Sequence, residues 1–169
     1  MPDQFDRPAF WSVLLDSLEA YLKADSGVVA LLTKTKPDNS GTFVDVAQGI
    51  TPNIPAPCIR VLRGNEGGQP LTGFQVGGIP EQIAVDFALC SQSLTPRDRS
   101  LSAKAPWDAL GNLEAATLAA LRRYFVPTRR LTTILGAPFE ASVSSITPTD
   151  GGYYPVVGST ISILLNKAE

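Results

Sequence analysis

The chain has 169 residues, with 16 acidic and 14 basic side chains and no histidine. Charged residues make up 18% and apolar residues 44%, so the composition excludes a disordered chain, and the length suits one domain that needs no disulfide or metal to fold. Without histidine, Ser-His-Asp and Cys-His nucleophile pairs and imidazole metal sites are excluded, so acid–base chemistry would fall to carboxylates, lysines or tyrosines.

The sequence shows no sign of a membrane segment or of a secretory leader. No stretch approaches the roughly 20 apolar residues of a membrane-spanning helix, and the acidic N-terminus lacks an apolar signal region. Two cysteines are too few for a disulfide scaffold. We therefore expect a soluble intracellular protein with no membrane partner.

The first half of the chain predicts a long helix followed by short elements. Apolar residues recur at helical spacing from Trp11 to Leu22, and Pro8 suits a first helical turn. Three prolines between residues 51 and 57 predict an extended, irregular segment. In chain order we expect a helix at about 7–24, a short helical turn at 28–32 capped by Asp25 or Ser26, a strand at 43–46 and a strand at 58–63.

Residues 64–80 predict a long loop. They contain six glycines, two prolines and one charged residue, Glu66. A loop of this length in a compact domain is usually functional or disordered. Its glycines lack the spacing of phosphate-binding and dinucleotide-binding loops, so we expect a flexible arm or contact loop that protrudes from the domain.

The second half predicts three more strands and a second long helix. Ile83, Val85, Phe87 and Leu89 alternate with small or polar residues, as in a strand with one buried face. In chain order we expect a strand at 82–89, a helix at 106–125, a short β-like or helical segment at 131–135, and an antiparallel hairpin of 139–146 and 153–165 around a turn at 147–152. This order predicts a single α+β domain over residues 1–169, with an antiparallel or mixed sheet and two main helices packed on one face.

Few residues suggest chemistry. Cys58 and Cys90 form no C-x-x-C motif, and we interpret them as small buried side chains at strand ends. Asp45, Asp86 and Asp150 lie on or near strands, and paired carboxylates can serve catalysis or bind a hard cation. Nothing in their spacing brings these three together, and we expect Asp86 to face solvent or a partner subunit. We therefore predict no catalytic residue, no cofactor and no metal site.

The only basic cluster surrounds the end of the second long helix. It consists of Arg122, Arg123, Arg129 and Arg130. Three interpretations are open: solvated cations that complement the helix dipole, contact with an acidic neighbouring subunit, and contact with nucleic acid. No aromatic residues accompany these arginines in a recognisable nucleic-acid-binding motif.

The low charged fraction and the mean hydropathy of +0.08 leave much of the surface apolar or neutral. Soluble monomers seldom expose large apolar patches, so we expect either burial in an assembly or a larger single core. The loop 64–80 and the C-terminal hairpin are the best candidates for assembly contacts, because exposed strands pair readily with another chain. The residues predicted at a subunit or partner interface are Arg60, Arg63, Phe74, Val76, Asp86, Arg122, Arg123, Arg129, Arg130, Tyr153 and Tyr154.

The order of segments resembles that of a known family. An opening helix (FWSVLLDSLEA, 10–20) is followed by a proline-rich approach to a strand (IPAPCIRV, 54–61), a long loop, a strand (EQIAVDF, 81–87), a helix, and a closing hairpin (TDGGY, 149–153, to STISIL, 159–164). Over about residues 8–166 this order resembles the tail-terminator proteins of tailed bacteriophages, also called tail-completion or head–tail joining proteins.

The resemblance implies a structural virion protein of the tail or neck, assembled in the host cytoplasm. Its copies would form a ring of six at the head-proximal end of the tail. The ring would stop polymerisation of the tail tube protein and join the tail to the head connector or neck protein, and DNA would pass through its channel without sequence-specific binding. The loop 64–80 would contact a neighbour or the tube. Heterologous interfaces that close on themselves suffice for such a ring, and no enzymatic activity is implied.

Three other functions stay open. One is a different tail or connector subunit of a phage, and one is a general interaction module of a cellular protein. The third is a small enzyme or ligand-binding domain that uses carboxylates, which a deep pocket with convergent Asp and Lys groups of perturbed pKa would indicate.

Overall fold

The computed structural model describes residues 10–49, 56–64, 81–92, 104–126, 128–149 and 156–168. The expected loop 64–80 lies outside these residues except for Gly64, and so does the segment 150–155. Four predicted interface residues also lie outside them: Phe74, Val76, Tyr153 and Tyr154.

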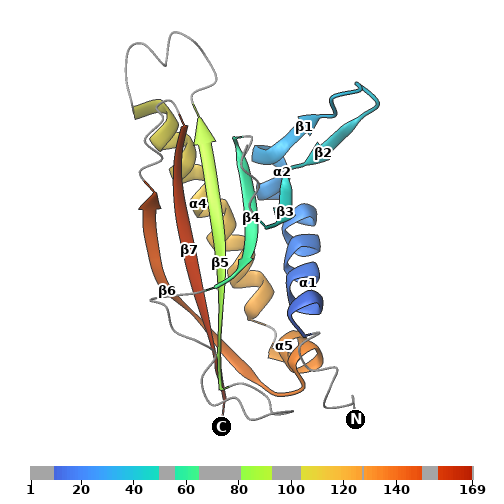
Figure 1. Ribbon diagram of the computed structural model, residues 1–169, viewed down its shortest axis with the longest axis vertical. Coiled ribbons are helices and arrows are strands. Elements are labelled where there is room, and N and C mark those ends of the chain that lie inside the picture. Colours follow the sequence, from blue (N-terminus) through green and yellow to red (C-terminus); the bar gives the residue numbers. More distant parts are fainter. Residues whose placement is uncertain are drawn as a thin grey trace.

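The described elements follow one another in an α+β order (Figure 1). They are α1 (Phe10–Ala24), α2 (Ser26–Leu32), β1 (Thr33–Thr35), β2 (Thr42–Val44), β3 (Val46–Gln48), β4 (Cys58–Arg63), β5 (Gln82–Gln92), α4 (Lys104–Phe125), α5 (Thr128–Leu135), β6 (Phe139–Thr149) and β7 (Val156–Lys167).

Five of these strands form one mixed sheet in the order β3-β4-β5-β7-β6. β3 runs parallel to β4, and the other neighbouring pairs are antiparallel. β1 and β2 form a separate antiparallel ribbon that projects from the body of the domain (Figure 1). The α+β class with a mixed sheet is confirmed.

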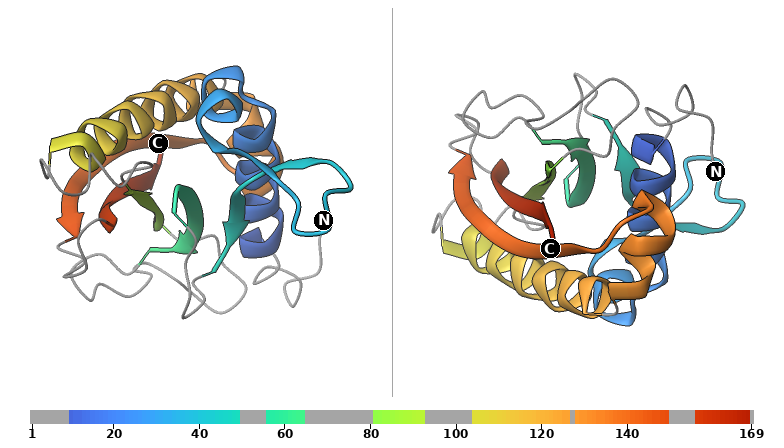
Figure 2. Two further views of the ribbon diagram at one scale, coloured as in Figure 1. Left: turned by 90° about the horizontal axis from the view of Figure 1, so that it is seen from above. Right: turned by 90° about the horizontal axis from the view of Figure 1, so that it is seen from below.

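The hydrophobic core lies between the sheet and the helices α1 and α4 (Figure 2). Along β5, the side chains of Ile83, Val85, Phe87 and Leu89 are buried, whereas the residues between them are half-buried. α4 packs against β5 and β7, and α1 packs against β3 and β4. The two main helices therefore share one sheet face, as predicted. Among the described helices, none is long and apolar enough to cross a membrane.

The expected strand at 43–46 is divided in the structure at Asp45. The N–H of Asp45 donates to the C=O of Leu32 at 3.0 Å, and its C=O accepts from the N–H of Ile59 at 3.1 Å. Because its two backbone groups bond to different elements, the chain leaves the ribbon and enters the sheet at this residue.

The structure decides one open alternative and moves one boundary. The segment 131–135, expected to be β-like or helical, belongs to the helix α5, because Leu131 and Leu135, four residues apart, are both buried on one helix face. Residues 147–149 of the expected turn belong to β6, which pairs with β7 as far as Thr149.

Candidate assembly interface

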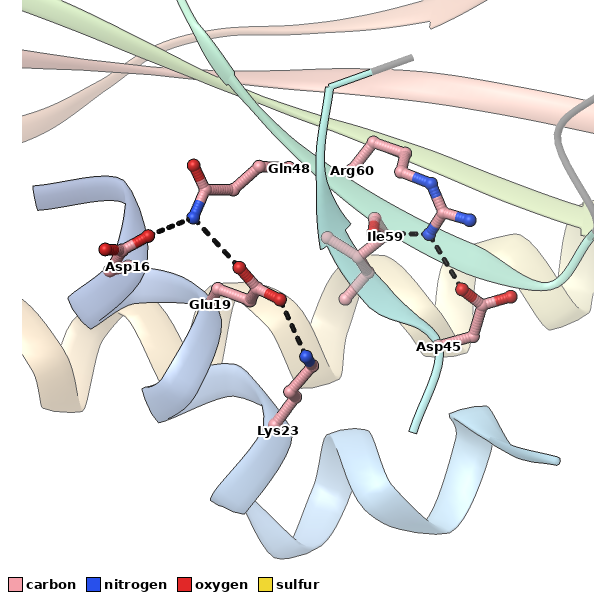
Figure 3. Close-up of polar contacts among 7 residues, drawn as sticks. All are labelled: Asp16, Glu19, Lys23, Asp45, Gln48, Ile59 and Arg60. Atoms are coloured by element: carbon pink, nitrogen blue, oxygen red, sulfur yellow. Dashed lines mark hydrogen bonds and ion pairs between the residues drawn. The ribbon is translucent and has the colours of Figure 1, made fainter. Parts of the chain in front are cut away.

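Asp45 joins the ribbon to the sheet through its side chain as well. Its Oδ1 accepts a hydrogen bond from Arg60 Nη1 in β4 at 2.8 Å (Figure 3), and its Oδ2 accepts one from Lys34 Nζ in β1 at 2.5 Å. Arg60 also donates to the C=O of Ile59 at 3.0 Å. Asp45 and Arg60 are only 5% and 7% exposed. The charge of Arg60 is therefore balanced within its own chain. The assignment of Arg60 to an interface stays a prediction.

A second polar cluster holds the edge strand β3 against α1. Gln48 Nε2 donates to Asp16 Oδ1 at 2.5 Å and to Glu19 Oε2 at 2.9 Å, and Lys23 Nζ lies 2.6 Å from Glu19 Oε1 (Figure 3). Burial alone would raise the pKa of Glu19, but the hydrogen bonds from Lys23 and Gln48 hold that pKa below its ordinary value. This edge of the sheet is thus covered by a helix, and β6 forms the opposite edge.

Arg130, predicted at an interface, packs inside its own domain. Its guanidinium carbon lies 4.8 Å from the centre of the Tyr21 ring and 4.6 Å from that of Tyr124. Its Nη1 donates to the C=O of Tyr124 at 3.0 Å. Tyr124 is fully buried, its hydroxyl donates to Ser17 Oγ at 2.8 Å, and burial raises the pKa of its hydroxyl. Arg130 is therefore part of the joint between α1, α4 and α5.

Arg123 connects α4 to the start of α2. Its Nη2 lies 2.5 Å from Asp25 Oδ2. Asp25 is the N-cap of α2, which confirms one of the two residues expected at that position. Its Oδ1 accepts hydrogen bonds from the N–H of Gly27 at 3.0 Å and from the N–H of Val28 at 3.3 Å. Burial alone would raise the pKa of Asp25, but the hydrogen bonds from Arg123, Val28 and Gly27 outweigh it and lower that pKa.

The three remaining arginines of the prediction differ in their surroundings. Arg63 is exposed, and its guanidinium carbon lies 5.3 Å from the centre of the Trp11 ring. Arg122 is exposed on α4 and lines a groove. The side chain of Arg129 lies outside the described residues. The four-residue basic cluster is therefore divided among different sites, and Arg122 is its exposed member that lines a cavity.

This groove has a volume of about 600 Å³ and lies between the C-terminal half of α4 and the edge strand β6. Arg122 and Glu140 are its charged lining residues, and both are exposed. The apolar lining residues are Leu118, Leu121, Phe125, Val126, Phe139, Ala141, Val143 and Ile163. Of these, Val126 is 70% and Val143 is 49% exposed. Because exposed apolar patches rimmed by polar groups mark interaction sites, the groove is the strongest candidate interface of the described surface.

The other sheet face carries Asp86 and the two cysteines. Asp86 Oδ1 is buried and has no hydrogen-bond partner among the described residues. The interface role predicted for Asp86 stays a prediction. Cys58 in β4 and Cys90 in β5 lie directly opposite each other, and both are free thiols. In the described parts of the chain, no three His, Cys, Asp or Glu side chains are grouped to hold a metal ion.

Sequence reasoning missed both the ribbon and the groove. The ribbon does have a signal, because Pro37-Asp38-Asn39-Ser40-Gly41 is a turn sequence between two short runs containing threonine. The groove has none, since it arises from the position of α4 relative to β6.

Comparison with known proteins bears on the fold. No family model matches the sequence, and no curated protein matches it. Among solved structures, the chain is similar to the gp17 protein of bacteriophage SPP1, with a TM-score of 0.50 and 15% sequence identity. The similarity covers 100% of this chain and 98% of that one. At this identity the likeness shows a shared fold, and its coverage means that it concerns the whole domain.

Proposed function

We propose that the chain is a structural protein of a tailed-bacteriophage virion and acts as a tail terminator. In this role a ring, with six copies, sits at the head-proximal end of the tail, stops polymerisation of the tail tube protein and joins the tail to the head connector. The observation that carries the proposal is the likeness in fold to the gp17 protein of bacteriophage SPP1 over the full length of the domain.

The surface of the domain is consistent with a ring. A cyclic assembly needs two different, complementary surfaces on each copy. The domain has two unlike exposed features, the ribbon and the groove, which are formed by different elements. The net charge of −2 also suits a channel that DNA passes without being retained, because non-specific affinity for DNA comes from an excess of Lys and Arg.

The test combines oligomeric state with control of tube length. Light scattering coupled to size exclusion gives the mass of the purified protein, and particle images show whether rings form. The protein is then added to a polymerising tail tube protein of the same phage. A terminator produces rings that cap tube ends and halt growth.

Other outcomes separate the alternatives. Tubes that lengthen by incorporating the protein would assign it to another tail subunit. A monomer at high concentration that leaves tube length unchanged would overturn the proposal.

A further inference from the structure

The ribbon is a structured protrusion with little core of its own. Its tip is ordered by local hydrogen bonds: Lys36 N–H to the C=O of Gly41 at 2.9 Å, Asn39 N–H to the C=O of Lys36 at 2.9 Å, and Ser40 Oγ to Asp38 Oδ1 at 2.6 Å. The ion pair between Lys34 and Asp45 holds its base to the sheet. A two-stranded ribbon is marginal alone, so a preformed one that stands clear of the body is suited to contact another surface.

The ribbon also carries an apolar anchor and two charges. Phe43 in β2 is 38% exposed, and Lys36 and Asp38 are exposed near the tip. The groove has corresponding features: an apolar floor, the cation Arg122 and the anion Glu140. Among the described residues, neither Arg122 nor Glu140 has an ion-pair partner. The charges of the two surfaces are therefore complementary in sign.

The two surfaces are formed by different elements of the domain. The ribbon projects on the side of α1 and α2, and β6 is the far edge of the sheet (Figures 1 and 2). No residue of the ribbon lines the groove of its own chain, so a second copy can supply the ribbon, and repetition of this contact gives a head-to-tail interface of the kind that closes rings.

We infer that the β1–β2 ribbon of one copy docks into the α4–β6 groove of the next, with Phe43 as the apolar anchor and with Lys36 near Glu140 and Asp38 near Arg122. This inference deepens the proposed ring function and rests on it. It commits the groove to one occupant, a second copy of this chain.

The test uses one variant on each surface of the full chain. Phe43→Ala removes the anchor, and Val143→Glu places a charge in the groove; both side chains are partly exposed, so neither change empties the core. Each variant is expected to weaken self-association at least about tenfold, as loss of an interface anchor does. Val13→Ala, at an exposed apolar residue of α1 that belongs to neither surface, is the matched control and is expected to assemble normally.

Mixing the two variants distinguishes this contact from any other. The Phe43→Ala chain keeps its groove and the Val143→Glu chain keeps its ribbon. The mixture is therefore expected to form a heterodimer with one intact interface and no larger assembly. Charge exchange adds a second readout: Lys36→Glu and Glu140→Lys each weaken assembly, and the double variant recovers it. Circular dichroism of each variant confirms that the fold is retained.

The results separate this inference from the proposed function. If the wild-type chain forms rings and all the variants still do so, the docking inference fails while the ring function stands. If the wild-type chain is monomeric at high concentration, docking between copies is overturned together with the ring.

Discussion

Asp45 and Arg60 form a buried ion pair at the point where the projecting ribbon leaves the sheet, with 2.8 Å between Oδ1 and Nη1. Arg60 pairs in register with Ala47 of β3, two residues beyond Asp45, so the parallel pairing of β3 with β4 brings the two side chains to the same place. Lys34 completes the arrangement from the ribbon side. One carboxylate therefore fixes both the edge of the sheet and the direction of the ribbon.

Replacing Asp45 is expected to be costly. Asp45→Asn preserves the side-chain volume but leaves the buried guanidinium of Arg60 uncompensated, which costs about 3–5 kcal/mol of unfolding free energy. Urea denaturation measures the loss. The matched control is Glu81→Gln, because Glu81 and Lys167 form an exposed pair at 3.5 Å and its removal is expected to cost less than about 1 kcal/mol. Equal losses in the two variants would contradict the role given to Asp45.

Arg130 and Arg122 are expected to differ in their effect on stability although the sequence places them in one basic cluster. Arg130→Ala removes stacking on two tyrosine rings and a hydrogen bond to a buried carbonyl, and is expected to lower the unfolding free energy by about 1–3 kcal/mol. Arg130→Lys keeps the charge but not the planar group, so it recovers only part of the loss. Arg122→Ala, at an exposed position, is expected to stay within about 0.5 kcal/mol of the wild type. Thermal and urea unfolding of dilute protein measure all three, and a larger effect at Arg122 would exclude this interpretation.

Local patterns in the sequence predict most of the fold. The strand β4 has the predicted limits of 58–63, and the prolines that precede it mark its start. The alternation of β5 and the helical spacing of α1 depend only on neighbouring residues. Cap chemistry likewise predicts Asp25 or Ser26 as the N-cap of α2, and Asp25 takes that position.

The candidate interface depends on contacts between segments that are distant in the sequence, and patterns among neighbouring residues do not predict such contacts. Arg122 and Arg123 are adjacent, yet Arg123 pairs with Asp25, 98 residues away, while Arg122 faces a groove. The division of the expected strand 43–46 at Asp45 depends on its bonds to Leu32 and Ile59. Such choices are decided by tertiary packing, where local propensity is a weak guide.

The two cysteines are expected to differ in reactivity. A hydrogen bond from the Cys58 thiol lowers the pKa of Cys90 to about 7, while that bond and burial raise the pKa of Cys58. Iodoacetamide should therefore label Cys90 first, with a rate that rises around neutral pH, because the thiolate is the nucleophile. In Cys58→Ala the pH midpoint of labelling at Cys90 is expected to move up towards the ordinary thiol value of 9.0. Mass spectrometry of labelled peptides across pH gives both rates; equal labelling of the two thiols would rule out this pairing.

Asp25 is expected to make stability depend on pH under acidic conditions. Its pKa in the folded chain lies below the ordinary value of 3.8, so the unfolded chain takes up the proton first as the pH falls. The stabilisation by its ionised form is therefore fully present above that ordinary value and is lost as the pH falls through the folded pKa. Asp25→Asn keeps an N-cap but loses the charge, so its deficit relative to wild type should be constant from neutral pH to about pH 5 and shrink below about pH 4.

Urea midpoints at a series of pH values measure this deficit. Asp25→Ala serves as the comparison, because it also removes the cap and is expected to lose about 1 kcal/mol more than Asp25→Asn at neutral pH. A deficit of Asp25→Asn that does not change with pH would show that the charge of Asp25 contributes nothing.

Two glycines are expected to respond to alanine with opposite signs. A Cβ at Gly64 would lie 2.6 Å from the carbonyl carbon of Ala84 and 2.7 Å from its oxygen, and Gly64 N–H donates to that oxygen at 2.8 Å. Because the obstacle is backbone, β4 and β5 must separate, and Gly64→Ala is expected to cost about 1–3 kcal/mol. A Cβ at Gly111, in α4, meets nothing within 4 Å, so Gly111→Ala is expected to gain about 0.5–1 kcal/mol through helix propensity. If the effect of glycine came only from the entropy of the unfolded chain, both variants would be more stable than wild type, so urea denaturation of the pair separates the two explanations.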